Sequence, residues 1–189
     1  LAYVTIRDIL GSPVTAVIGR QYFYYGNSFI FASCGTNNTA PADSGLSNIA
    51  NDLTIHTALD TLRLIFNYDP VVVETFWAKV DDNLNTSASQ KDDVDLYGLN
   101  AGYQLGDGWD SAVEGYFFAK LDKSTQTDNA NVGTKSDSIY VPGIHISTNP
   151  IEGLNLQAEA ALQRGNRAST SVATNNQERE AMGGQLIAN

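Results

Sequence analysis

Several charged side chains in this 189-residue sequence stand alone inside stretches where apolar residues recur at every second position. In a β-strand this spacing places a charge and its apolar neighbours on opposite faces. Isolated charges on the wetted face of a sheet can attract or repel ions and polar solutes that move past them. If such a sheet closes into a barrel, its wetted face lines a lumen. We expect this role for eight residues, which are Arg7, Arg20, Arg63, Lys79, Asp81, Glu114, Lys120 and Glu159.

Arg63 and Lys79, expected on neighbouring strands, form the best pair for attracting carboxylates or other anions. The basic residues are offset by acidic ones, however, so the predicted lumen is not purely basic. The alternative is that charges in a lumen pair with one another and remain wetted, without any selective role.

The side on which Arg20 lies is ambiguous. Val14, Ala16 and Ile18 suit lipid, but with them Arg20 would enter hydrocarbon, at a cost of about 2–4 kcal/mol at the midplane. Either a bulge changes the phase of the strand, or Arg20 faces the lumen. We prefer a lumenal Arg20, which places on the lipid side Thr15, Val17, Gly19 and Gln21.

Bond-making chemistry finds little support. His56 and His145 lie far apart and outside any metalloprotease spacing, and neither Ser111 nor Ser147 has a Gly-x-Ser-x-Gly setting. We therefore expect no enzyme and no cofactor. The exception to consider is Ca²⁺, because hard cations prefer oxygen ligands. An extracellular rim could offer it the carboxylates of Asp81, Asp82, Asp92, Asp93 and Asp95, although most such runs are solvated loop charges.

The elements that must position these residues follow from an alternation of short and long connections. Turn residues cluster at 11–13, 67–70, 106–110 and 149–153, whereas long polar stretches occupy about 27–57, 82–93, 123–137 and 166–178. Tight turns on one side and wide loops on the other are typical of up-and-down β-barrels of the bacterial outer membrane. No helical period holds for more than about ten residues, apart from a short helix that could form within residues 44–62, around Leu46, Ile49, Ala50 and Leu53.

The period of two also assigns faces. Lipid contact is expected for Leu99, Tyr103, Phe117, Leu156 and Leu162. For residues 75–81 the pattern puts Phe76, Ala78 and Val80 on the lipid side and Trp77 with Lys79 on the other, although Glu74 then falls on the apolar side.

Nine candidate strands result, and the fold class is an all-β, antiparallel, transmembrane barrel. Single-chain bacterial barrels have even strand numbers. We therefore expect one outer-membrane barrel domain over residues 1–189, incomplete at one or both ends and part of a barrel of about 16–18 strands. The net charge of −10 argues against a nucleic-acid partner, and Cys34, the single cysteine, permits no internal disulfide.

Several runs of residues resemble the alginate-export family of outer-membrane porins. The likeness is carried by residues 2–7, 12–21 and 25–26, with their Gly-Arg-Gln box, and by residues 59–63 and 73–79. It covers about the first hundred residues, and the rest matches in rhythm only. The resemblance implies a monomeric barrel of about eighteen strands. It also implies a lumen through which an anionic polysaccharide leaves.

We therefore expect an outer-membrane porin for passive diffusion or export of small or polymeric, anionic solutes such as polysaccharide. Its partners would be the lipid bilayer, lipopolysaccharide and the solute, and a periplasmic or outer-membrane partner is a further option. Two alternatives stay open. One is a structural barrel that scaffolds an electron-transfer or secretion partner, and the other is a soluble β-sandwich that binds carbohydrate.

Overall fold

The computed structural model describes residues 2–22, 24–27, 29–30, 59–81, 94–122, 137–167 and 177–189. They form nine strands and one short 3-10 helix, η1 (Ile9–Gly11). The strands are β1 (Ala2–Ile6), β2 (Val14–Gln21), β3 (Leu59–Tyr68), β4 (Val71–Asp81), β5 (Val94–Gln104), β6 (Ala112–Asp122), β7 (Asp137–Ile151), β8 (Leu154–Arg167) and β9 (Gln177–Ala188).

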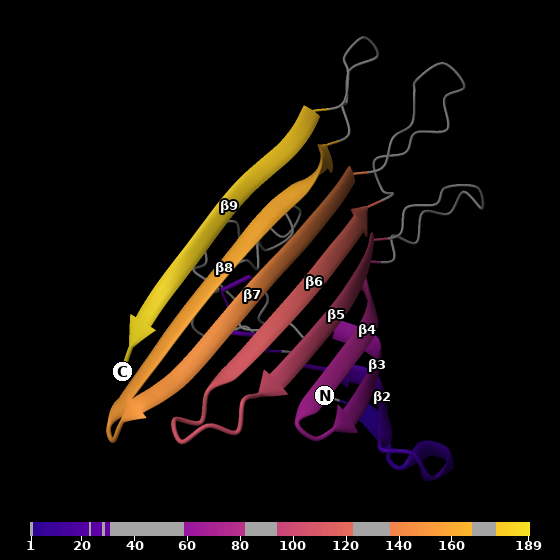
Figure 1. The fold of residues 1–189 in the computed structure, drawn as a ribbon. Helices are drawn as coiled ribbons and strands as arrows, with labels where there is room; N and C mark the ends of the chain where they lie inside the picture. The colour runs from indigo at the N-terminus through magenta and orange to yellow at the C-terminus, as the bar shows by residue number, and fades with distance from the viewer. Residues whose placement is uncertain are drawn as a thin grey trace, which may run out of the picture.

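All nine strands belong to one antiparallel sheet in which sequence neighbours are spatial neighbours, from β1 to β9 (Figure 1). Within the described ranges the sheet is open, with β1 and β9 as its edges. The predicted all-β, up-and-down arrangement with nine strands is thereby confirmed. Among the same residues, no helix has the length and hydropathy needed to traverse a bilayer.

The short turns lie where turn chemistry predicts them. Gly11, Gly106 and Gly153 adopt positive φ angles of 73°, 67° and 80°, which glycine accepts without steric cost. Strand β2 ends at Gln21, and the chain then turns onto one face of the sheet, where Tyr25 contacts Glu74. We call this the inner face, and the opposite one the outer face.

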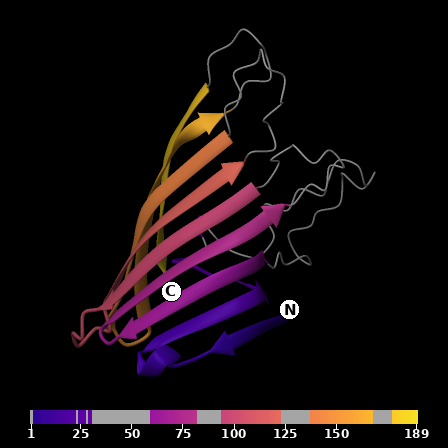
Figure 2. The same ribbon diagram turned by 90° about the vertical axis from the view of Figure 1, so that its right-hand side faces the viewer.

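The sheet curves around the inner face, as two views at right angles show (Figures 1 and 2). Asn27 donates its backbone N–H to Glu159 on β8, six strands away from β2. In a flat sheet these strands would lie about 29 Å apart. The six residue-to-residue steps from Gln21 to Asn27 span about 20 Å at most. The chain can therefore make this contact only by crossing the hollow of a curved sheet.

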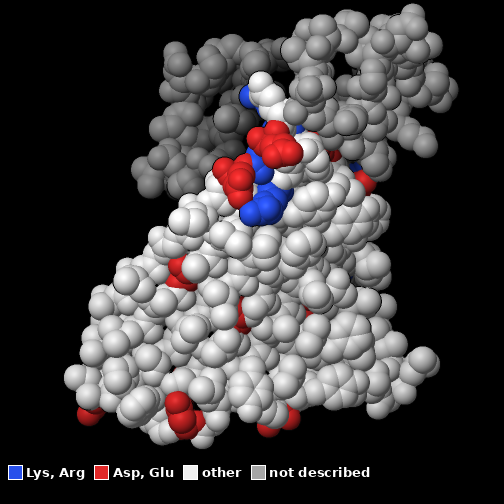
Figure 3. All heavy atoms as spheres, turned by 45° about the horizontal axis from the view of Figure 1, so that its top comes forward, with Lys and Arg blue, Asp and Glu red and all other residues white. Residues whose placement is uncertain are grey.

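The outer face is uncharged between its two ends. Register pairs link Ile18 to Leu62, Leu62 to Trp77 and Trp77 to Tyr97, so an apolar row crosses four strands. Where the described strands adjoin the long connections, the outer face carries Arg20, Asp60, Lys79, Asp95, Arg164, Glu178 and Glu180. The tight turns carry Asp8, Asp69, Asp107, Asp110 and Glu152. Between these sets the strand register places no Asp, Glu, Lys or Arg of the described strands outward. Figure 3 shows this region as mostly uncharged, with only small patches of acidic atoms visible in it.

The inner face holds the buried core. Phe76 of β4 and Phe118 of β6 pack with Tyr25, with ring centroids 5.8 and 5.5 Å from the tyrosine ring. Two cross-strand glycines make room for aromatic rings. A Cβ on Gly98 would lie 2.0 Å from the Phe76 ring, and one on Gly143 would lie 2.3 Å from the Tyr116 ring.

We expect Gly98→Ala and Gly143→Ala each to destabilise the folded sheet by about 1–3 kcal/mol, because the added methyl group overlaps a ring that neighbouring side chains hold in place. Gly115→Ala is the matched control, since a Cβ there meets nothing within 4 Å. Urea unfolding of the full-length protein measures the difference in unfolding midpoint. Equal midpoints for the three variants would show that the rings move aside freely.

Candidate functional site on the inner face

Residues 24–27, here called the inner segment, lie across the inner face and contact three carboxylates. The Tyr25 hydroxyl donates to Glu74, the Gly26 backbone N–H donates to Glu114, and the Asn27 N–H donates to Glu159. These glutamates lie on β4, β6 and β8. Three successive residues are thus held by three alternate strands.

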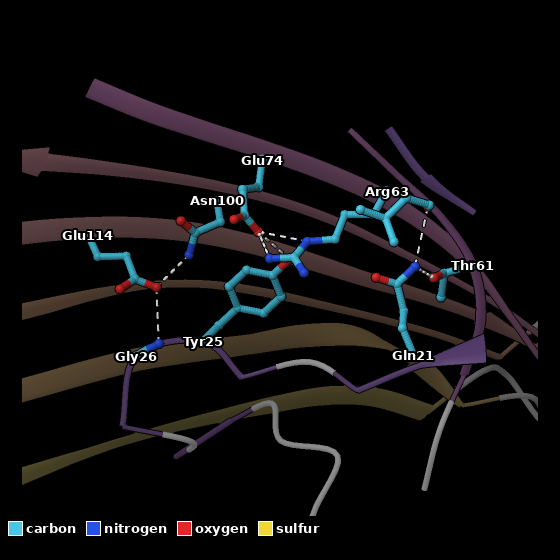
Figure 4. Close-up of polar contacts among 9 residues, drawn as sticks. Gln21, Tyr25, Gly26, Thr61, Arg63, Glu74, Asn100 and Glu114 are labelled. Carbon is cyan, nitrogen blue, oxygen red and sulfur yellow. Dashed lines mark hydrogen bonds and ion pairs between the residues drawn. The ribbon is translucent and has the colours of Figure 1, made fainter. Parts of the chain in front are cut away.

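Glu74 is the carboxylate with a cationic partner. Its Oε2 accepts from Nε and Nη2 of Arg63 at 3.1 and 2.6 Å, and from the Tyr25 hydroxyl at 3.0 Å (Figure 4). Burial, and then the nearby Glu74 carboxylate, raise the pKa of Tyr25 well above its ordinary value. Tyr25 therefore remains a neutral donor at physiological pH.

Glu114 is held by neutral donors. Its Oε1 accepts from the Asn100 side-chain amide and, at 3.0 Å, from the Gly26 N–H (Figure 4). On the neighbouring strand, His145 is its register partner, with Nδ1 3.8 Å from Glu114 Oε2. Nε2 of His145 is buried without a hydrogen-bond partner in the described part of the chain.

Glu159 is the most deeply buried of the three, with 3% of its surface exposed. Its donors are the Tyr116 hydroxyl at 2.7 Å, the Asn27 N–H at 2.8 Å and the Gln185 side-chain amide at 3.2 Å. All three donors are neutral. Because a buried carboxylate is costly to hold without a counter-charge, these bonds are needed to keep it in place.

Gly26 fits closely against Glu159. Its φ angle is 54°, and a Cβ at this position would lie 2.7 Å from Glu159 Oε1. A glycine is therefore required here both for backbone conformation and for space.

No family model, curated protein or solved structure matches this chain. The site must therefore be interpreted from its own geometry. The resemblance to the alginate-export family, drawn from the sequence, stays a prediction.

Five of the eight residues predicted for a lumen lie on the inner face. Arg7 lines a groove there with Thr15, Gln21 and Arg63. The strand register puts on the same face Arg63, Glu114, Lys120 and Glu159.

Two of the eight lie on the opposite face, so their placement was wrong. The register pairs Arg20 with Asp60, and Asp60 with Lys79, on the outer face beside Ile18 and Leu62. Arg20 forms a 2.6 Å ion pair with Asp60, and both side chains are more than half exposed. It lies at the charged end of the outer face, beyond the apolar band, where its guanidinium is exposed. The preferred phase of β2 is thereby reversed, because Val17 and Gln21 are buried on the inner face.

The predicted phase of β4 was also wrong. Phe76 and Ala78 are inward, with 3% and 0% of their surfaces exposed, whereas Trp77 is outward. The physical reason is Glu74, which accepts hydrogen bonds from Arg63 and Tyr25 on the inner face. Because residues two apart in a strand share a face, Phe76 lies on the inner face as well. The sequence held this signal, since Glu74 does not fit a lipid-facing side. The Arg63 and Lys79 pair proposed from the sequence is separated by the sheet.

The five residues predicted to contact lipid share the outer face in the strand register, and each is between 39% and 49% exposed, but their contact with lipid stays a prediction. They are Leu99, Tyr103, Phe117, Leu156 and Leu162.

The calcium prediction stays untested. Asp95 is buried and accepts a hydrogen bond from Nε1 of Trp77 at 3.1 Å. The side chain of Asp81, and Asp82, Asp92 and Asp93, lie outside the described residues, as do His56, Cys34 and the helix considered within 44–62. Among the residues that are described, no cluster of three or more metal-ligating side chains occurs.

Proposed function

We propose that this chain forms part of an outer-membrane β-barrel of the porin type, through which hydrophilic solutes diffuse passively. The observation that carries the proposal is the outer face. Across nine strands it offers only uncharged side chains between two charged ends. A sheet surface of this kind suits hydrocarbon, with its charged borders in the headgroup regions.

Aromatic residues support this orientation. Trp77, Tyr97 and Tyr140 lie on one register row near the long connections. Tyr68 and Tyr103 lie on another row near the tight turns. Two such rows resemble the aromatic girdles found where transmembrane strands meet the membrane surfaces. Strands β3 to β6 have 10 or 11 residues each, which is the length that a tilted transmembrane strand needs.

The inner face would then line the passage, and the inner segment would narrow it. Polar and charged groups of both signs are found there, as a water-filled lumen requires. The expectation of an anionic solute has less support than before, because Arg20 and Lys79 face outward and Arg63 is paired with Glu74. We therefore propose passive diffusion without committing this function to alginate or another polyanion.

Two measurements on the full-length protein test this proposal. We expect heat-modifiable migration in detergent gels, and stepwise ion conductance after reconstitution in planar bilayers. A protein that stays monodisperse in water without detergent would contradict membrane insertion. A detergent-dependent protein that never conducts, and co-purifies with another chain, would favour the scaffold instead.

A further inference from the structure

The inner face differs in charge from one side to the other. On β1–β3 it carries the basic residues Arg7 and Arg63, and Arg63 is neutralised by Glu74. On β6–β8, beneath the inner segment, it carries Glu114 and Glu159 with His145 between them in register. The acidic side is the one over which the inner segment lies.

The groups that donate hydrogen bonds to Glu114 and Glu159 provide no counter-charge for these two carboxylates. A neutral amide, hydroxyl or backbone N–H satisfies a carboxylate oxygen but brings no counter-charge. In the described part of the chain, the groups that contact these two glutamates are of this neutral kind, apart from His145, which is cationic only when protonated. The nearest lysine on the strand of Glu114 is Lys120, about 20 Å further along β6.

The connection that supplies the inner segment adds no positive charge. Residues 22–58 contain no lysine and no arginine, but they contain Asp43 and Asp52. Whatever conformation this connection takes, its ionised groups are negative at neutral pH, apart from any protonated His56.

Because of these charges, we infer that the passage prefers cations, and that Glu114 and Glu159 set this preference. The inference rests on the proposed channel function and assigns its solute class. Where the inner segment narrows the passage, low-dielectric walls concentrate the field of two uncompensated carboxylates. Mobile cations are then enriched at this point and anions are depleted. Small inorganic cations and amines have the required chemistry.

The experiment measures reversal potentials of the full-length protein in planar bilayers under a KCl gradient, at low ionic strength so that screening stays weak. We expect potassium to be more permeant than chloride. Glu114→Gln and Glu159→Gln should each lower the permeability ratio, and the double variant should lower it by about twofold or more. Arg63→Gln should raise it, because the charge of Glu74 is then uncompensated.

Glu152→Gln is the matched control, because it removes the same charge from the tight turn between β7 and β8 and should leave the ratio unchanged. Heat-modifiable migration in gels verifies that every variant is folded. If the double variant does not fold, the permeability ratios of the two single variants test the inference. Conductance with chloride preferred, or ratios unchanged in folded variants, would overturn the cation inference and leave the channel intact. Absence of conductance in the wild type would instead contradict the proposed function itself.

Discussion

Replacing Gly26 by alanine is expected to displace the inner segment from the sheet and to raise single-channel conductance by about twofold or more. The added methyl group would lie 2.7 Å from Glu159 Oε1, and that carboxylate is fixed by Tyr116 and Gln185. The segment can yield more easily than the strands. The N–H bonds from Gly26 to Glu114 and from Asn27 to Glu159 would then be lost together.

Backbone strain alone could produce a similar change, so the control must carry the same strain. Gly106 has a φ angle of 67° and open space around its Cβ position. Gly106→Ala therefore has the same conformational cost without the clash, and its conductance should equal that of the wild type. Amide exchange of Asn27 gives a readout that does not depend on ion flow. Unaltered protection in Gly26→Ala would mean that the segment tolerates the methyl group.

Placing a charge in the middle of the outer face should have the largest effect on folding. We expect Leu99→Arg to destabilise the protein in a bilayer by about 2–4 kcal/mol, because arginine at that depth must leave water. Leu99 is 49% exposed, so in a water-soluble sheet the same change would be almost neutral. Denaturant unfolding in lipid vesicles distinguishes these cases.

Gln163→Arg on the inner face of β8 is the companion variant. Its side chain lines a pocket with Lys120 on the wetted side, where a further cation costs little. We expect Gln163→Arg to insert and unfold like the wild type. If both arginine variants had the same stability, the outer face would not be in contact with hydrocarbon.

The number of strands and the position of their turns could be predicted because both depend on local residues. A period of two and clusters such as 106–110 act within a few residues of the chain. The faces of β5, β6 and β8 could also be predicted, since each has one apolar and one polar side. Strand β4 has apolar residues on both sides, so hydrophobicity alone leaves its phase undetermined, and only Glu74 indicates which side is inward.

The inner segment could not be predicted because its partners lie far away in sequence. Tyr25 and Glu74 are 49 residues apart, and Asn27 and Glu159 are 132 apart. Nothing in the spacing of Tyr25 to Asn27 identifies carboxylates on β4, β6 and β8 as acceptors. Arg20 was misplaced for a similar reason, because its counter-ion Asp60 is 40 residues away. Predicting the inner segment or the placement of Arg20 requires knowledge of which residues are paired between strands.

The short stretch from Gln21 to Asn27 also limits how widely the curved sheet can spread. It joins β2 to β8 across the hollow, so its contour length sets an upper bound on the separation of those strands. Adding residues to this stretch would relax that bound without altering any strand. The curvature of the sheet is therefore adjustable through one short piece of chain. In the proposed channel this stretch would also set the bore, so variants of different length should sieve solutes of different size.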